Sequence, residues 1–259
     1  MIPLTFDYLS KQFKTIGIRK GQTIIVHCSL SKMGWVVGGS EAVIQALIGA
    51  VGENGTLMMP TQTWKNLDPS RGVYDVPESY WSVIRKHSLA YNPATTPSIG
   101  MGVVAELFRT FPGTKRSSHP VRSFAALGAQ AEWLLDKHDL EDVFGNSSPL
   151  AKLYDLDGYI LLIGVDHSVN TSLHLAEHRA DYPDKFYVSE SSAILVNRKR
   201  EWVTYQTLNL KADDFATIGN AYEAANKIPL DRLGQATVRF IKQRPLVDWA
   251  ISWMEQYRK

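Results

Sequence analysis

A histidine and a glutamate three residues apart, His174 and Glu177, are the side chains of this sequence best suited to acid–base chemistry. They follow an apolar run at residues 161–165, and residues three apart on a helix lie on one face, so the two side chains would be neighbours. A histidine near its ordinary pKa of about 6.5 takes up a proton at neutral pH. A neighbouring carboxylate orients the ring and stabilises its charged form, so the spacing favours a general base with its orienting acid.

Two further histidines flank this pair, and a structural interpretation stays open beside the catalytic one. The same His–Glu spacing is common on solvated helix surfaces. His178 is adjacent to Glu177 in sequence and therefore points to a different face, which favours a solvated or packing role. His167 follows the apolar strand directly, where open α/β sheets bind their ligands, and it is the reserve candidate for the base.

A second polar cluster lies in the segment HCSLSKMGWVVGG, directly after a β-branched strand at residues 23–26. The glycines and the helix start that follow can present backbone N–H groups to an anion such as a phosphate, although an ordinary turn has the same composition. Neither a Walker loop nor a Gly-x-Gly-x-x-Gly fingerprint is present. His27 and Cys28 would point to opposite faces of the strand, which argues against a histidine-activated Cys28 nucleophile.

Two other segments carry candidate binding groups. RSSHPVRSFAALG holds more polar donors than a loop needs, and Arg116 or Arg122 would suit a phosphate. The loop after MPTQTW contains Asp68 and Tyr74, an acidic and an aromatic side chain of the kind that binds a polycation or a sugar. Solvated loop residues explain the same composition equally well.

Composition indicates a soluble globular chain without a nucleic-acid partner. The 259 residues are 44% hydrophobic and 21% charged, and the formal net charge of +2 comes without a basic run. The single cysteine excludes an internal disulfide, and no convincing set of metal ligands is present. Neither a signal segment nor a membrane-spanning stretch is apparent, so we expect a cytoplasmic protein.

The pattern of apolar segments predicts one domain over residues 1–259 with a three-layer α/β/α fold. Strands are expected at residues 23–26, 56–59, 124–127 and 161–165, alternating with helices, which is typical of a mainly parallel central sheet. Residues 186–188, 193–196 and 202–208 read as strands with a charged turn at 197–201. They predict a small antiparallel extension, in the C-terminal third, at the edge of the sheet.

Seven motifs in order resemble the aminoglycoside 3-N-acetyltransferase family, also called the antibiotic N-acetyltransferases, over nearly the whole chain. They are HCSLSKMGWVVGG, MPTQTW, TPSIGMGVVAELFR, RSSHPVRSFAALG, SSPLAKLY, DGYILLIGV and NTSLHLAE. The resemblance implies transfer of an acetyl group from acetyl-CoA to the 3-amino group of a 2-deoxystreptamine ring, by direct transfer and without a metal. The partners it implies are acetyl-CoA and an amine or aminoglycoside.

Carried onto this sequence, the resemblance makes His174 the general base and Glu177 its orienting acid or a contact to the aminoglycoside. Thr171 is a candidate donor to the oxyanion that forms on the thioester carbonyl. The residues expected to bind acetyl-CoA are His27, Cys28, Ser29, Leu30, Ser31, Arg116, Ser117, Ser123 and Phe124. Asp68, Tyr74 and Glu177 are the expected acceptor contacts.

Two alternatives to aminoglycoside acetylation stay open at this point. One is a CoA-binding protein without turnover, and the other is an acyltransferase for a different amine, because the loop that should contact the acceptor matches the family least clearly. A hydrolase that uses Cys28 is a more distant third. The oligomeric state is also open, with a homodimer as one option.

Overall fold

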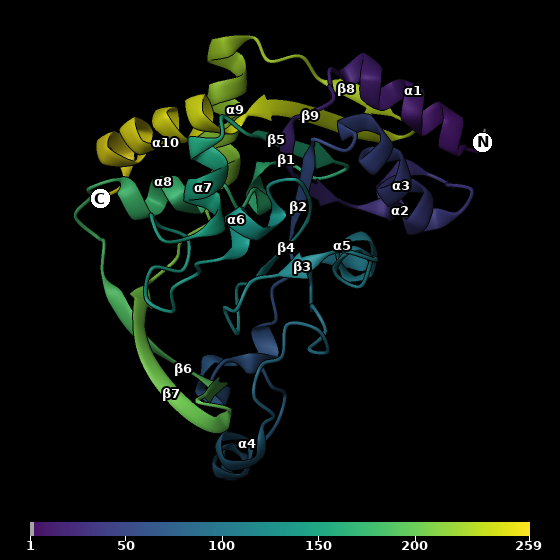
Figure 1. The fold of residues 1–259 in the computed structure, drawn as a ribbon. Coiled ribbons are helices and arrows are strands. Elements are labelled where there is room, and N and C mark those ends of the chain that lie inside the picture. Colours follow the sequence, from purple (N-terminus) through teal and green to yellow (C-terminus); the bar gives the residue numbers. More distant parts are fainter. Residues whose placement is uncertain (1–2) are drawn as a thin grey trace.

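A computed structural model describes residues 3–259, and over these residues the chain forms a seven-stranded mixed sheet and a separate two-stranded one (Figure 1). The strands of the large sheet run in the order β3 (Lys115–Arg116), β4 (Phe124–Gly128), β2 (Thr56–Pro60), β1 (Thr23–Cys28), β5 (Tyr159–Ile163), β9 (Ala236–Lys242) and β8 (Asp231–Leu233). The three central strands β2, β1 and β5 are parallel, whereas β4 and β9 run antiparallel to their inner neighbours.

The central strand β1 is apolar on both sides because both faces of the sheet are covered by helices. Ile24 and Val26 pack into the core on one face, and Ile25 packs into the core on the other. His27 continues the side of Ile25, and Cys28 continues the side of Ile24. The last two side chains of this strand, His27 and Cys28, therefore point into opposite layers.

Helices cover the two faces in the three layers that the sequence predicted. One layer contains α1 (Phe6–Ile16), α2 (Leu30–Met33), α3 (Gly39–Val51) and α5 (Gly102–Arg109). The other contains α6 (Ala131–Leu135), α7 (Pro149–Asp155), α8 (Leu173–Arg179), α9 (Phe215–Asn226) and α10 (Gln243–Tyr257). The predicted α/β/α fold with its antiparallel extension is confirmed, with antiparallel strands added at both edges of the sheet.

The antiparallel extension is a hairpin of β6 (Tyr187–Val196) and β7 (Lys199–Leu208), and its position differs from the predicted one. It does not join the edge of the large sheet, where β8 and β9 pair instead. Figure 1 shows it extending from the body beside α4 (Trp81–His87). Arg200 donates to the carbonyl of Ser88 over 3.0 Å, and the Tyr91 N–H donates to the carbonyl of Ala193 over 2.9 Å. The hairpin and the segment around α4 thus support each other.

Three short 3-10 turns complete the segment that leads into α4: η1 (Trp64–Asn66), η2 (Pro69–Arg71) and η3 (Glu78–Tyr80). The hairpin is fastened to the body by Arg122, whose guanidinium forms a buried ion pair with Glu190 of β6. Within residues 3–259, no helix combines the length and apolar character needed to span a bilayer.

Candidate active site

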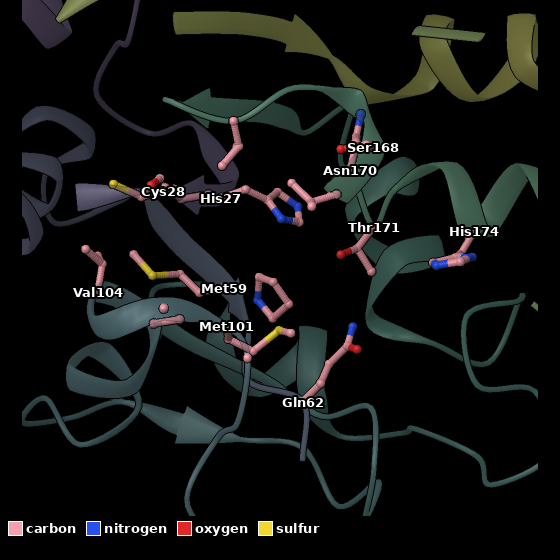
Figure 2. A pocket seen from close by; sticks show the side chains of 18 of the residues that line it. His27, Cys28, Met59, Gln62, Met101, Val104, Ser168, Asn170, Thr171 and His174 are labelled. Carbon is pink, nitrogen blue, oxygen red and sulfur yellow. The ribbon is translucent and has the colours of Figure 1, made fainter. Parts of the chain in front are cut away.

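A cavity of about 410 Å³ opens at the carboxyl ends of β1, β2 and β5, where part of the polar sequence motifs meets (Figure 2). Its lining is Val26, His27, Cys28, Ser29, Met59, Pro60, Gln62, Trp64, Gly100, Met101, Gly102, Val104, Ala105, Val165, Ser168, Val169, Asn170, Thr171, His174 and Phe215. The position agrees with the general rule that α/β sheets bind ligands outside the carboxyl ends of their strands.

His174 reaches this cavity from α8 and is paired with Glu177 one turn further along the helix. Its Nδ1 lies 2.7 Å from Oε2 of Glu177, and the two side chains are 15% and 0% exposed. The imidazole stacks on Phe144 with ring centroids 4.8 Å apart, and Phe215 contacts it edge-on at 4.7 Å. Two aromatic rings and a carboxylate therefore fix the orientation of the imidazole.

The same surroundings hold His174 in its neutral form at neutral pH. Burial lowers the pKa of His174 below its ordinary value, while the hydrogen bond and the negative charge of Glu177 oppose that effect in part. A neutral imidazole that donates from Nδ1 carries its lone pair on Nε2. His174 is consequently equipped to accept a proton at Nε2 while Glu177 stabilises the imidazolium that results.

Glu177 lies behind His174 and does not line the cavity. Its second oxygen, Oε1, accepts from the backbone N–H of Lys211 over 2.6 Å and from Nη1 of Arg258 over 2.9 Å. Both oxygens of Glu177 are therefore occupied, and the residue is fully buried. The geometry pairs Glu177 with His174, and its expected contact to the acceptor stays a prediction.

His27 and Cys28 follow the predicted alternation at the end of β1, and both line the cavity. Burial lowers the pKa of His27 to about 4, and its Nε2 has no hydrogen-bond partner within residues 3–259. Burial likewise raises the pKa of the Cys28 thiol to about 12, so the thiolate is not populated at neutral pH. The cavity is therefore lined here by a neutral histidine and by a thiol that is not ionised at neutral pH.

Close contact between the chain segments after β1 and β5 explains the glycine at position 164. The Ser29 N–H donates to the carbonyl of Ile163 over 2.9 Å. Gly164 has φ +66, and a Cβ there would lie 2.7 Å from the Cβ of Lys32. Ser29 lines the cavity, whereas the next residues of the predicted cofactor segment, Leu30 and Ser31, begin α2 just outside it.

The segment between β5 and α8 forms one wall of the cavity. Asp166 caps the 3-10 turn η4 (His167–Val169) by accepting from the Ser168 N–H over 2.9 Å. The turn is followed by Asn170 and Thr171, which both line the cavity. Figure 2 shows Thr171, His27 and His174 around the same cavity, so a hydroxyl and two imidazoles lie together there.

The reserve candidate His167 lies beneath this wall and not in the cavity. It is fully buried, its Nε2 lies 2.9 Å from Oε1 of Glu223, and its Nδ1 lies 3.1 Å from Nδ2 of Asn170. Both ring nitrogens are therefore occupied in packing η4 against α9. His178 points to another face, as predicted, with its Nδ1 3.3 Å from Oδ1 of Asp142.

Arg116 does not line the cavity, and its expected role in phosphate binding stays a prediction. Its Nε donates to the hydroxyls of Thr61 and Ser123, and its Nη2 donates to the hydroxyl of Thr63 over 3.0 Å. It also donates to backbone carbonyls of Thr61, Pro93 and Thr96. The guanidinium is thus fully used in joining β3 to two neighbouring loops.

The other members of that segment are likewise internal. Ser117 hydrogen-bonds to Nδ1 of His138 over 2.9 Å, Ser123 donates to the carbonyl of Thr61 over 2.9 Å, and Phe124 packs in the core. All three are buried and none of them lines the cavity, and their expected contact with the cofactor stays a prediction. Internal loop packing uses the same hydroxyl and cationic donors as an anion site does.

Asp68 and Tyr74 are placed away from the cavity as well. Oδ2 and Oδ1 of Asp68 accept from Nε and Nη2 of Arg85 over 2.7 and 2.9 Å. The hydrogen bond from Arg85, together with those from Ser70, lowers the pKa of Asp68 to about 2. The hydroxyl of Tyr74 donates to the carbonyl of Lys65. Both side chains order their own loop, and their expected contact with an acceptor stays a prediction.

Several residues of the cavity were not identified from the sequence. Gln62, Trp64 and Met101 line it, and they lie in or beside motifs that the family resemblance had singled out. Phe144 and Phe215, which pack on His174, carry no sequence signal because they are distant along the chain. Within the part of the chain that the structure describes, no cluster of three or more His, Cys, Asp and Glu side chains is arranged to hold a metal ion.

Comparison with known proteins places the chain among acetyltransferases. A family model described as aminoglycoside 3-N-acetyltransferase matches residues 25–255. The SPbeta prophage-derived aminoglycoside N(3')-acetyltransferase-like protein YokD of Bacillus subtilis is 41% identical over 97% of this chain and 92% of its own length. Aminoglycoside N(3)-acetyltransferase VII of Streptomyces paromomycinus is 34% identical over 98% of this chain and 92% of its own length.

Solved structures agree with these sequence relatives. The crystal structure of YokD superposes with a TM-score of 0.96 at 40% identity, covering 99% of this chain and 95% of that one. AAC-VIa bound to sisomicin gives 0.89 at 30%, covering 98% of each chain, and AAC-IIIb with CoASH gives 0.87 at 28%, covering 98% and 97%. The chain therefore belongs to the aminoglycoside 3-N-acetyltransferase family.

Proposed function

We propose that this chain transfers the acetyl group of acetyl-CoA directly to the 3-amino group of a 2-deoxystreptamine aminoglycoside, with His174 as the general base. The observation that carries the proposal is the buried pair of His174 and Glu177 at the wall of the cavity. Two relatives support the two substrates, since AAC-IIIb binds CoASH and AAC-VIa binds sisomicin.

The proposed step balances without a covalent enzyme intermediate. The amine nitrogen bonds to the acetyl carbon, and the carbon–sulfur bond of the thioester breaks. Nε2 of His174 takes the proton that the amine loses, and the imidazolium can then return it to the departing thiolate. Direct transfer fits Cys28, because a thiol whose pKa is raised to about 12 by burial is a poor nucleophile and argues against the hydrolase alternative.

The donor end of the cavity offers groups suited to a thioester and its pantetheine chain. Met59, Met101 and Val104 provide an apolar wall, and His27 brings a buried polar nitrogen that has no partner among the described residues. The Thr171 hydroxyl is the candidate donor to the oxygen on which negative charge develops. Donors already in place in a site sheltered from water stabilise that charge more than water does.

A different amine acceptor is the second candidate, and a specific feature of the cavity favours it. None of the residues that line the cavity, within the described part of the chain, is an aspartate or a glutamate. Asp68, the acidic residue expected to hold a polycation, is paired with Arg85. An acceptor that carries one amine on an otherwise neutral body would meet this lining at a lower desolvation cost than a polycation.

A thiol-release assay with acetyl-CoA distinguishes the candidates. The protein and acetyl-CoA are incubated in three parallel reactions. One contains 2-deoxystreptamine aminoglycosides, the second contains aminoglycosides that lack a free 3-amino group, and the third contains simple monoamines. The proposal expects thiol release and an acetylated product only when the 3-amino group is free. Thiol release with monoamines alone would support the second candidate. Binding of CoA without thiol release in any of the reactions would indicate a CoA-binding protein without turnover.

A further inference from the structure

An arginine from the far end of α10 holds the carboxylate that orients His174. Arg258 follows the last residue of the helix, and its Nη1 lies 2.9 Å from Oε1 of Glu177. The same guanidinium donates from Nε and Nη2 to the two oxygens of Asp214, each over 2.8 Å. Arg258 therefore bridges α8 to the residue that precedes α9.

The end of the bridge at Glu177 is buried, whereas its other partner, Asp214, is 26% exposed. The side chain of Arg258 is 7% exposed and that of Glu177 is fully buried. Its guanidinium also lies over the ring of Tyr182, 5.0 Å from the centroid. Burial opposes the charge of Arg258, but the hydrogen bond to Asp214 and the charges of Glu177 and Asp214 outweigh it and raise the pKa of Arg258. The arginine stays charged at every pH at which the protein is folded.

The geometry divides the two oxygens of Glu177 between separate tasks. Oε1 is held by Arg258 and by the backbone N–H of Lys211, and Oε2 faces Nδ1 of His174. Without Arg258, Oε1 would keep a single partner, the backbone N–H of Lys211, and the angle at which Oε2 meets the imidazole would be less well fixed. A planar, rigid donor such as guanidinium is suited to fixing this angle.

We propose that Arg258 is a positioning residue of the transfer reaction, which fixes Glu177 against His174 and weakens the affinity of this pair for a proton. The proposal rests on the proposed role of His174 as the base. A cation next to a His–Glu pair disfavours protonation of the pair, and the pair titrates as one coupled unit. Arg258 would thereby help to keep His174 neutral and ready at neutral pH.

Other charged and titratable groups also face the pair. They are His178 on α8, Arg122 before β4, Tyr182 and Lys185 after α8, Lys211 through its backbone N–H, and Asp214 before α9. Arg122 and His178 lower the pKa of His174 directly, after the larger effect of burial. Replacing Arg258 alone leaves both of these side chains in place.

The test is an NMR pH titration of the protein labelled with ¹³C at histidine, with the His174 signal assigned through His174→Ala. Arg258→Gln should move the titration of His174 to higher pH, and the acidic limb of the transfer rate should move with it. Glu177→Gln should move both to lower pH, the opposite direction. Arg258→Gln should also lower kcat by up to about 10²-fold, because a displaced catalytic group loses its attack geometry.

Arg244→Gln is the matched control, since Arg244 lies on the same helix but pairs with the exposed Asp157 over 2.7 Å. It should leave the titration unchanged. Should Arg258→Gln fail to fold, Asp214→Asn tests the same charge balance with the opposite sign. Without the negative charge of Asp214, less of the positive charge of Arg258 is neutralised, and Arg258 opposes protonation of the His174–Glu177 pair more strongly. His174 should then titrate at lower pH.

Three outcomes are separable. A His174 titration that moves as expected, with the rate profile following it, supports the positioning role. A titration that does not move in Arg258→Gln, in protein shown to be folded, overturns the proposal whatever the activity. If the His174 titration moves but the pH–rate profile does not, the assignment of His174 as the base is contradicted. The effect of Arg258 on the His174–Glu177 pair is then still supported.

Discussion

Nδ1 of His174 lies 2.7 Å from Oε2 of Glu177, the imidazole packs against Phe144 and Phe215, and the carboxylate is held by Arg258. Enclosure lowers the pKa of His174, and the carboxylate partly restores it. These opposed effects keep the ring neutral near pH 7 while its conjugate acid remains stabilised. This balance is what a general base that takes a proton from an amine at neutral pH requires.

Glu177→Gln should reduce transfer less than the loss of His174 and should shift its pH dependence. The variant keeps the imidazole but removes the negative charge that raises its pKa, so burial is no longer opposed and the pKa falls further. The acidic limb of the pH–rate profile, which marks protonation of the base, should then move to lower pH. Steady-state rates between pH 5 and 8 measure it, and a limb that moves upward would contradict the account.

Cys28→Ser should retain most of the activity. The thiol is buried, its pKa is raised to about 12, and its Sγ lies 3.9 Å from Sδ of Met33, so it packs as an apolar group. Mass spectrometry of the wild-type protein after incubation with acetyl-CoA should show no acetylated Cys28. Loss of turnover in the serine variant together with an acetylated thiol would instead indicate a covalent acetyl-enzyme.

Arg116→Ala should lower stability without weakening the binding of acetyl-CoA. The substitution removes the donors to Thr61, Thr63 and Ser123, and buried acceptors left unpaired cost about 1–3 kcal/mol. Urea unfolding measures the first effect and calorimetry with acetyl-CoA the second. A large loss of acetyl-CoA affinity with unchanged stability would instead indicate that Arg116 contacts acetyl-CoA.

The protein should lose stability as the pH falls from 6.5 towards 4. Burial lowers the folded-state pKa of His27 and of His138 to about 4 from 6.5. Between these values the unfolded chain binds more protons than the folded one, so the free energy of unfolding decreases as the pH falls. Each of the two histidines contributes a decrease of about 1.4 kcal/mol per pH unit within this window. Urea midpoints at several pH values test this, and a midpoint constant from pH 7 to 4.5 would refute it.

The sequence identified the layers of the fold and the His174–Glu177 pair because both depend on local spacing. Apolar runs such as that at residues 161–165 show where covered strands lie, and a three-residue interval shows which helix side chains meet. The position of the β6–β7 hairpin was missed, since a strand pattern does not reveal which element the strand will pack beside. Its partner, α4, lies about a hundred residues earlier.

The same limit applies to the side chains of the site. Arg116 and Asp68 have the chemistry of ligand-binding groups, and only the folded chain shows that Thr61 and Arg85 already occupy them. Arg258 was not singled out for the converse reason. A lone arginine near a helix end gives no sign that it contacts Glu177, about eighty residues earlier. Long-range partners of this kind become visible only in three dimensions.

The most direct test of the account is the turnover of His174→Ala compared with its affinity for acetyl-CoA. We expect kcat to fall by roughly 10²–10⁴-fold while the affinity for acetyl-CoA stays nearly unchanged, because the proton transfer is felt only in the transition state. His167→Ala and His178→Ala are the histidine controls and should remain active if folded. A folded His174→Ala variant that keeps wild-type kcat, while either control abolishes turnover, would contradict the assignment of His174 as the base.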